Sequence, residues 1–236
     1  MSGKGKLYLI PTLLGPSNWE KVMPKHIHKV LVNLKYFVAE DIRTSRRYLS
    51  KLSVTNIRDL NFSSLNKRTS KEELDHLLDP VKRGNDLGLL SEAGCPCLAD
   101  PGADLVGIAH QQNIQVVPLV GPSSILLALI GSGMNGQAFK FNGYLPKDRK
   151  LRIDAVLKLE KEANKGVTQI FIEAPYRNQH LLEAIVENSN TNTRLCIATD
   201  LTLDSEMILT RPVGQWKKKL PSINKKPTVF LLGKEN

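Results

Sequence analysis

The sequence predicts an α/β protein of two domains, the first built on a mostly parallel sheet and the second on a mixed sheet. Two observations carry this prediction. Short apolar runs alternate with amphipathic segments along the whole chain, which is typical of sheets covered by helices. The chain also has 236 residues, which is enough for two domains of about 100 residues each.

Strands and helices alternate regularly through the first half. Apolar runs predict strands over residues 7–12, 36–39, 87–90 and 114–117. Helical spacing predicts helices after Pro24 and over residues 43–52 and 104–111. Ser70, followed three residues later by Glu73, has the capping-box pattern and predicts a further helix start. Residues 56–66 are polar and show no clear period.

The second half contains more strands for each helix. Pro122, Ser123 and Ser124 open an apolar helix that runs through Ile130. Further elements are predicted as helices over residues 151–162 and 181–186, and as strands over residues 139–141, 169–172, 195–198 and 229–232. This balance predicts a mixed sheet. Because the pattern changes near residues 119–121, we place the domains at residues 1–119 and 120–236.

Composition narrows the functional class. No apolar run approaches the roughly 18 residues of a membrane span, and the N-terminus leads directly into a strand, so we expect a cytoplasmic protein without a membrane partner. The 3 cysteines are too few for a disulfide framework. Cys95 and Cys97 lack a second Cys pair or spaced histidines, so we expect no metal site.

The chain is strongly basic, with a net charge of +10. Excess Lys and Arg attract polyanions, which moderately favours a nucleic-acid partner. The cations cluster at residues 43–47, 147–150 and 217–219. Each cluster alone is more often a solvated face, so only their sum carries weight.

Four loops directly follow predicted strands, where open α/β sheets bind their ligands. They span residues 11–15, 39–43, 91–96 and 119–124. Taken singly, each is more often a simple turn. The chain has no GxxxxGK[ST] loop, no GxGxxG fingerprint and no GxSxG elbow, which argues against a P-loop nucleotidase, a dinucleotide-binding enzyme and a common hydrolase.

Five ordered segments carry a family resemblance: residues 7–12 (LYLIPT), 39–43 (AEDIR), 91–102 (SEAGCPCLADPG), 121–124 (GPSS) and 173–177 (EAPYR). In order and spacing they resemble the small-subunit ribosomal RNA cytidine 2′-O-methyltransferases, a family of tetrapyrrole methylases. The resemblance covers nearly the whole chain. It implies a homodimer of two-domain subunits that bind S-adenosyl-L-methionine in a cleft between the domains and methylate ribosomal RNA in the small subunit.

The same resemblance, carried over position by position, implies a set of cofactor contacts. These are Pro11, Leu14, Glu92, Cys95, Ser124, Ile125, Ile172, Ala198, Pro227 and Thr228. Backbone groups at strand ends could pair with the adenine and amino-acid parts of the cofactor, while apolar side chains cover its sulfonium.

Catalysis and substrate contacts rest on charged residues. Glu40, Asp41 and Glu173, with Asp200 as a further possibility, are candidate bases for the hydroxyl proton, although each could instead cap a helix or form a surface ion pair. The expected RNA contacts are Arg43, Arg46, Arg47, Lys147, Arg149, Lys150 and Arg177. Arg43 and Arg177 could equally form buried structural pairs.

The chain departs from the family at polar positions. Glu92 and Cys95 stand in a turn that usually reads SDAGTP, residues 173–177 lack the histidine of ESPHR, and residues 199–203 (TDLTL) replace RELTK. Two alternatives therefore stay open: the same fold and cofactor with a tetrapyrrole or protein side chain as acceptor, or a catalytically weak RNA-binding paralogue.

Overall fold

The structure is a computed structural model that describes residues 3–66 and 68–234. It divides into two compact units, one ending at Ser123 and the other beginning at Ser124. The boundary predicted between residues 119 and 120 lies in the same connection, between β5 and α7.

The first unit is built on a parallel sheet. Its strands are β1 (Lys6–Ile10), β2 (Tyr36–Ala39), β3 (Asn61–Ser64), β4 (Leu87–Leu90) and β5 (Gln115–Pro118). They lie in the order β3-β2-β4-β1-β5, and every described pair of neighbours is parallel. Register pairs Leu87 of the central β4 with both Leu7 and Tyr36. This confirms the parallel sheet predicted from the sequence.

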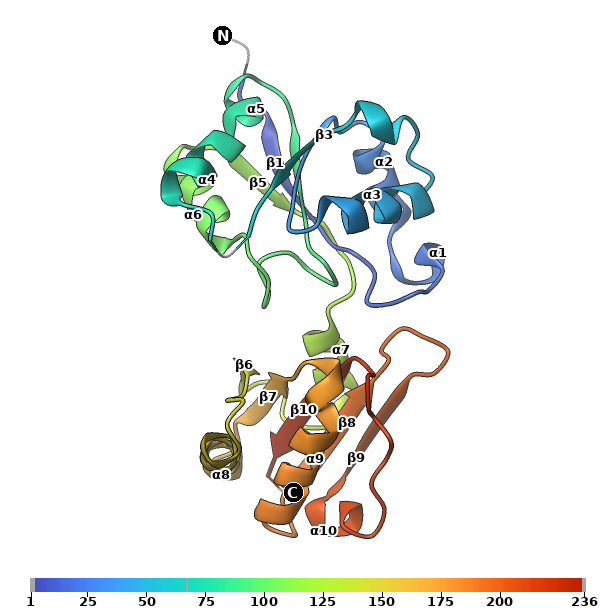
Figure 1. The fold of residues 1–236 in the computed structure, drawn as a ribbon, viewed down its shortest axis with the longest axis vertical. Helices are drawn as coiled ribbons and strands as arrows, with labels where there is room; N and C mark the ends of the chain where they lie inside the picture. Colours follow the sequence, from blue (N-terminus) through green and yellow to red (C-terminus); the bar gives the residue numbers. More distant parts are fainter. Residues whose placement is uncertain (1–2, 67, 235–236) are drawn as a thin grey trace. The chain divides into compact units, whose positions relative to one another are not determined.

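Helices cover both faces of this sheet. They are α1 (Trp19–Val22), α2 (Lys25–Leu31), α3 (Ile42–Lys51), α4 (Lys71–Leu77), α5 (Asp79–Lys82) and α6 (Ala103–Gln111). Figure 1 shows α2 and α3 on one side of the sheet and α4 and α6 on the other. Alternation along β2 explains this: Phe37 and Ala39 pack with α2 and α3, whereas Val38 packs with α4 and α6.

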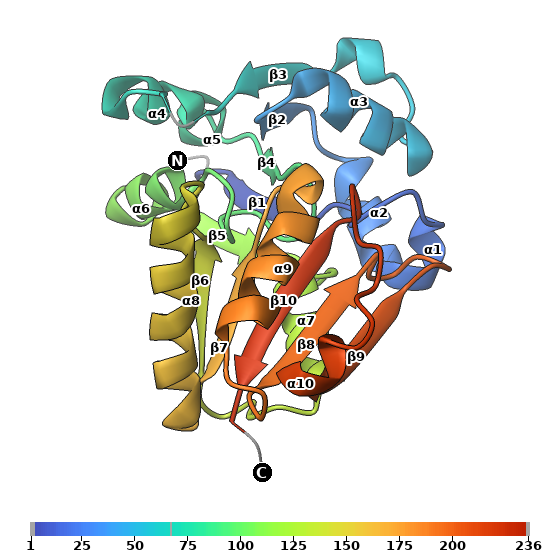
Figure 2. The same cartoon turned by 60° about the horizontal axis from the view of Figure 1, so that its bottom comes forward.

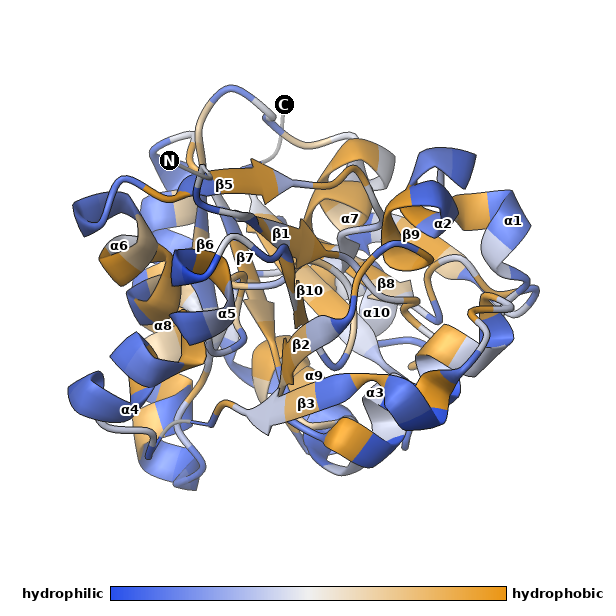
Figure 3. Cartoon of the chain, turned by 90° about the horizontal axis from the view of Figure 1, so that it is seen from above, coloured by the Kyte–Doolittle hydropathy of each residue, from blue (hydrophilic) through white to orange (hydrophobic). Residues whose placement is uncertain are grey.

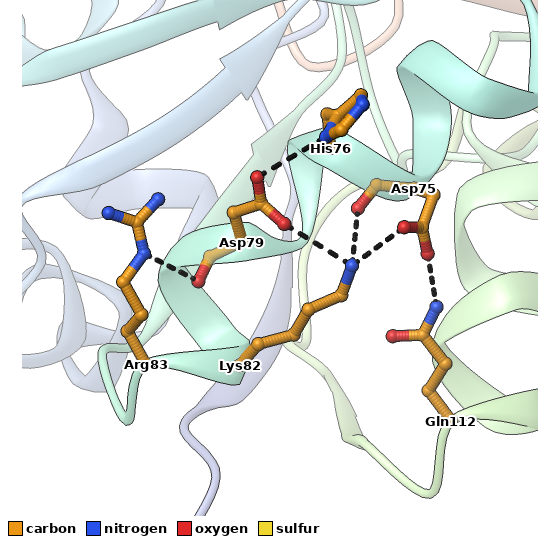
Figure 4. Close-up of polar contacts among 6 residues, drawn as sticks. All are labelled: Asp75, His76, Asp79, Lys82, Arg83 and Gln112. Atoms are coloured by element: carbon orange, nitrogen blue, oxygen red, sulfur yellow. Dashed lines mark hydrogen bonds and ion pairs between the residues drawn. The ribbon is translucent and has the colours of Figure 1, made fainter.

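Polar contacts fix the helices on the second of these faces. The capping box at α4 is confirmed, because the Ser70 hydroxyl accepts from the Glu73 amide and the Glu73 carboxylate accepts from the Ser70 amide. Lys82 then donates to Asp75 at 2.8 Å and to Asp79 at 3.2 Å, and Gln112 donates to Asp75 (Figure 4). These contacts tie α4, α5 and the end of α6 together.

The polar stretch over residues 56–66 contains structure that the sequence did not predict. A 3₁₀ turn, η1 (Ile57–Asp59), precedes β3. Strand β3 is an edge strand whose residues are mostly exposed, so its side chains carry no apolar alternation for a sequence pattern to detect. Phe62 is its apolar anchor and stacks on Phe37.

The second unit is built on a mixed sheet, as predicted. Its strands are β6 (Phe139–Tyr144), β7 (Thr168–Ile172), β8 (Arg194–Thr199), β9 (Met207–Pro212) and β10 (Thr228–Gly233). The order is β6-β7-β10-β8-β9; β6 and β7 are parallel, and the other described pairs are antiparallel. Strand β9 was not predicted, because it is a half-buried edge strand without alternation.

The helices of this unit also lie on both faces of the sheet. They are α7 (Ser124–Ser132), α8 (Arg149–Asn164), η2 (Pro175–Arg177), α9 (Asn178–Asn188) and α10 (Val213–Trp216). Figure 2 shows α8 and α9 in front of the sheet and α7 behind it. The stacked rings of Phe171 and Phe230 lie in the core beneath α8 and α9, and Trp216 donates to the Leu195 carbonyl at 3.0 Å.

Apolar residues are common in the central strands and vary in number among the helices. In Figure 3, β1 and α7 are largely apolar, whereas α4 alternates polar and apolar residues. Among the described residues, no helix has both the length and the apolar character needed to cross a bilayer.

Candidate active site

The first unit gathers its candidate site at one edge of the sheet. Because all its described strands are parallel, the loops that follow them meet at their carboxyl ends. The loops after β1 and β4 form an isolated antiparallel bridge, in which the Thr12 amide donates to the Gly94 carbonyl at 2.8 Å and the Gly94 amide returns a bond at 3.3 Å. Ser91 adds a hydroxyl bond to the Gly94 carbonyl at 2.7 Å.

Two glycines allow these loops to approach each other. Gly94 has a φ of +78°, and a Cβ there would lie 3.2 Å from Leu14. A Cβ on Gly121 would lie 2.2 Å from the Pro11 ring, which no side chain could tolerate. The loops after β1, β4 and β5 are therefore packed into one surface, and this brings together the predicted cofactor positions Pro11, Leu14 and Glu92.

Cys95 joins the same surface as a neutral thiol. Its Sγ donates to the Pro122 carbonyl at 3.5 Å, and burial raises its pKa. Burial, with a contribution from Asp100, raises the pKa of Cys97 to about 11. Thiols of this kind stay protonated near neutral pH and serve poorly as metal ligands. Within residues 3–66 and 68–234, no cluster of three His, Cys, Asp or Glu residues is placed to hold a metal.

The three carboxylates at this edge have different environments. Asp41 is the N-cap of α3 and accepts from the Thr44 amide at 2.7 Å, and this bond is the main cause that lowers its pKa. Glu40 is exposed. The pKa of Glu92 is raised, first by burial and then by the charges of Asp41 and Glu40. The three carboxylates thus lie close enough to influence one another.

A buried tyrosine that the sequence did not single out fixes α3 to this edge. The Tyr48 hydroxyl donates to the Pro11 carbonyl at 2.8 Å, and burial raises its pKa. Tyr48 lies on the buried face of α3. In the sequence, a tyrosine that only fills the core and one that also anchors a loop show the same helical spacing. Only the fold reveals the hydrogen bond.

In the second unit, the loops after β7 and β8 and the loop before β10 also meet at one edge. The Asp200 amide donates to the Pro227 carbonyl at 3.0 Å, and the Lys225 amide donates to the Pro175 carbonyl at 3.0 Å. Val229 of β10 pairs with Ile172 on one side and with Ala198 on the other.

This pairing brings together four of the expected cofactor positions, namely Ile172, Ala198, Pro227 and Thr228. Ala198 and Thr228 are buried, Ile172 is half-buried and Pro227 is exposed. The loop after β8 is strained, because Asp200 and Thr202 have φ values of +51° and +70°.

Glu173 and Arg177 form a buried ion pair across the start of η2. The Glu173 side chain is 0% exposed and that of Arg177 is 18% exposed. Oε1 of Glu173 accepts from Arg177 and, at 2.7 Å, from the Ala174 amide. Its second oxygen is buried with no partner among the described residues. Arg177 therefore has a structural partner, which was one of the two possibilities that the sequence left open.

The remaining predicted RNA contacts lie on helix surfaces. Arg43, Arg46 and Arg47 are exposed on α3, and Arg46 lies 5.1 Å over the Phe62 ring. Lys147, Arg149 and Lys150 are exposed at the start of α8, where Arg149 lies 3.8 Å from Glu187. Both groups keep their cations in solvent.

Solved structures with the same fold define the class of the chain. The methyltransferase CobJ matches with a TM-score of 0.63 and 17% identity, over 99% of this chain and 95% of that one. The uroporphyrin-III-C-methyltransferase of Thermus thermophilus matches with a TM-score of 0.56 and 16% identity, over 98% and 92%. The fold is that of the tetrapyrrole methylases, as the sequence motifs predicted. No protein-family model matches the chain.

Relatives in sequence define the family. The chain is similar to proteins named Ribosomal RNA small subunit methyltransferase I. The one from Buchnera aphidicola of Schizaphis graminum is 32% identical over 97% of this chain and 78% of the relative. The one from Thermotoga maritima is 31% identical over 98% of this chain and 100% of the relative. The protein of that name from Escherichia coli O157:H7 is 30% identical over 92% and 74%. The chain belongs to the ribosomal RNA small subunit methyltransferase I family and is a methyltransferase.

Proposed function

We propose that the chain transfers a methyl group from S-adenosyl-L-methionine to a ribose 2′-hydroxyl of small-subunit ribosomal RNA. The observation that carries the proposal is the similarity to proteins of that family, which extends over 97% of the chain in the Buchnera relative. The +10 net charge suits a polyanionic acceptor such as RNA better than an uncharged protein side chain.

The residues at the first edge fit such a methyl donor. Leu14 and Cys95 are partly exposed and offer apolar contact, while the exposed Glu92 carboxylate can face an ammonium group. Close packing at Gly94 and Gly121 keeps these groups on one surface. Pro11, Ser124 and Ile125, with Ile172, Ala198, Pro227 and Thr228, complete the proposed cofactor set.

The cofactor supplies a methyl group on a sulfonium, so the acceptor oxygen forms a bond to the methyl carbon as the carbon–sulfur bond breaks. The protein has to hold the oxygen in line and receive the hydroxyl proton. Asp41 and Glu173 have structural partners. Glu40 is exposed, and its carboxylate has no hydrogen bond or ion pair to the other described residues, which makes it the preferred base.

Arg43, Arg46 and Arg47 on α3, and Lys147, Arg149 and Lys150 on α8, are the proposed phosphate contacts. Arg177 should contribute less to phosphate binding, because its guanidinium already pairs with Glu173. A homodimer and a cytoplasmic location belong to the same proposal; the resemblance supports the first, and the three free cysteines suit the reducing conditions of the second.

Calorimetry with S-adenosylhomocysteine tests the cofactor part. We expect one site per chain, and a rise in Tm on binding because the ligand binds only the native state.

Ser124→Phe should abolish the heat of binding in a protein that stays folded, whereas Ser222→Phe at an exposed loop position should bind normally. Absence of binding at millimolar ligand in the unaltered protein would instead favour a catalytically weak RNA-binding paralogue.

A further inference from the structure

A pocket of about 350 Å³ opens at the carboxyl edge of the first sheet. Its walls come from three places: the loop after β1 (residues 12–15), one face of α3, and the turn after β4 (residues 91–93). This volume lies at the lower end of the range of about 300–1,000 Å³ that is usual for small-molecule sites. The pocket can hold a ligand of roughly nucleotide size.

One side of the pocket carries two cations. Arg47 and Lys51 stand four residues apart on α3, so their side chains share a helix face. Neither lies within ion-pair distance of a carboxylate among the described residues, although other cations, such as Lys82 and Arg177, do. Tyr48, on the same face, anchors the helix through its bond to Pro11. Two unpaired cations on a fixed helix favour a phosphate.

The other walls are different in character. Leu13 and Leu14 offer apolar surface, and Glu92 contributes a carboxylate whose pKa is raised by burial and by the neighbouring Asp41 and Glu40. The Thr12 and Ser91 hydroxyls are hydrogen-bonded to each other at 3.3 Å, and Ser91 also donates to the Gly94 carbonyl, so they add a polar wall. A simple anion would make no use of the carboxylate, and a simple cation would be repelled by Arg47 and Lys51. A ligand with a phosphate for Arg47 and Lys51, and with apolar surface and hydroxyl donors for the wall of Leu14 and Glu92, fits the whole pocket.

The position of the pocket relates it to the proposed cofactor residues. Leu14 and Glu92 belong to both sets. In the strand order β2-β4-β1-β5, the pocket lies toward β2 and its helix α3, while Cys95 bonds to Pro122 in the loop after β5. The pocket therefore adjoins the proposed cofactor residues and shares Leu14 and Glu92 with them.

We infer that this pocket binds one nucleotide of the RNA acceptor, with its phosphate at Arg47 and Lys51 and its ribose toward Glu92. The inference rests on the proposed function. Residues of one helix face, one loop and one turn can enclose a nucleotide only when its base leaves the stack of its neighbours, which costs least in a single strand. The acceptor is therefore an unpaired or easily extruded nucleotide.

The test compares two double variants with the same loss of charge. Arg47→Ala with Lys51→Ala removes the pocket cations, and Lys29→Ala with Arg58→Ala removes two exposed cations elsewhere on the first unit. Transfer of tritiated methyl groups is measured against the concentration of small-subunit RNA, together with binding of S-adenosylhomocysteine. We expect the KM for RNA to rise about tenfold or more in the pocket variant and less than about twofold in the control. Cofactor affinity should not change in either.

A second readout does not depend on turnover. In the presence of S-adenosylhomocysteine, nucleoside 5′-monophosphates should bind about tenfold more tightly than the matching nucleosides, and they should shift the amide resonances of residues 12–15, 44–51 and 91–93. This ratio should fall to about one in the pocket variant, since only the phosphate contacts are lost.

Three outcomes would overturn the inference. An unchanged KM in the pocket variant, or nucleotide shifts elsewhere on the protein, contradicts the pocket while leaving RNA methylation intact. A lack of label in RNA with the unaltered protein contradicts the proposed function itself, and the inference falls with it. The two failures are distinguished by whether the unaltered protein methylates RNA.

Discussion

At the residue scale, the environment of Glu173 distinguishes a structural role from a catalytic one. Its carboxylate is fully buried against Arg177, and one oxygen has no partner among the described residues. A catalytic base has to reach its substrate, whereas a buried ion-pair partner only has to hold its neighbour. The structure favours the second role for Glu173.

Glu173→Gln should lower the free energy of unfolding by about 3 kcal/mol, because it leaves a mostly buried guanidinium without its counter-charge. Urea denaturation, with an unchanged m-value, measures this loss. The control is Glu187→Gln, whose exposed carboxylate lies 3.8 Å from Arg149 and should contribute less than about 1 kcal/mol. A variant as stable as the parent but unable to transfer methyl groups would show that Glu173 acts in the chemistry.

Residue roles of this kind were only partly predictable. The sequence showed that Asp41 precedes a helix and that a cap was one of its possible roles, because capping depends on local spacing. It could not decide whether Arg177 meets RNA or a carboxylate. Nor could it pair Tyr48 with Pro11, since that bond joins residues far apart in the chain.

At the element scale, α3 forms one wall of the pocket and carries Arg47 and Lys51, so its N-cap matters. Asp41→Ala should destabilise the protein, with a lower Tm, since the Thr44 amide loses its acceptor. Asp41→Asn retains an acceptor oxygen and should retain stability. We expect Asp41→Asn also to transfer methyl groups normally, because a carboxyl with a lowered pKa is a weak base. Loss of transfer in a stable Asp41→Asn protein would identify Asp41 as the base.

The polar contacts among α4, α5 and α6 predict a pH dependence. Lys82 is the first cause that lowers the pKa of both Asp75 and Asp79 (Figure 4). A carboxyl with a lowered folded pKa binds fewer protons than in the unfolded chain, so its stabilisation is present above the unfolded pKa of about 3.9 and is lost as pH falls.

Lys82→Met should therefore lower Tm at pH 7, and the difference from the parent should shrink as the pH falls below about 4. Thermal melts at both pH values measure this difference. Lys71→Met serves as the control, because Lys71 is exposed and forms no ion pair with a described residue. A pH-independent difference would mean that Lys82 stabilises through its aliphatic stem.

The central strands of each sheet were predictable, as were the edge strands β5 and β6, whereas the edge strands β3 and β9 were not. Residues 36–39 and 87–90 are short apolar runs, as expected for strands covered on both faces. Strands β3 and β9 lie at sheet edges, where only part of each side chain is covered and the apolar signal fades. The site loops could be predicted because each follows a strand that the sequence predicts.

At the scale of the whole molecule, the net charge of +10 predicts that affinity for the proposed RNA acceptor depends strongly on salt. Each phosphate contact to a single strand releases counterion, with a log–log salt slope of about −0.7. Three or four contacts would reduce affinity by about twentyfold to fiftyfold between 50 and 200 mM salt. A small tetrapyrrole has no condensed counterion layer to release, so its slope should be much shallower, and an uncharged protein side chain should show none.

Transfer of tritium from labelled S-adenosyl-L-methionine to small-subunit RNA or intact subunits tests the central claim most directly. We predict label in RNA, recovered as a 2′-O-methylated nucleoside. Arg46→Ala with Arg47→Ala should reduce the label and flatten the salt slope without altering S-adenosylhomocysteine binding, because phosphate contacts position the RNA and do not build the cofactor site. Label found only in a tetrapyrrole or protein acceptor, with none in RNA, would contradict the account.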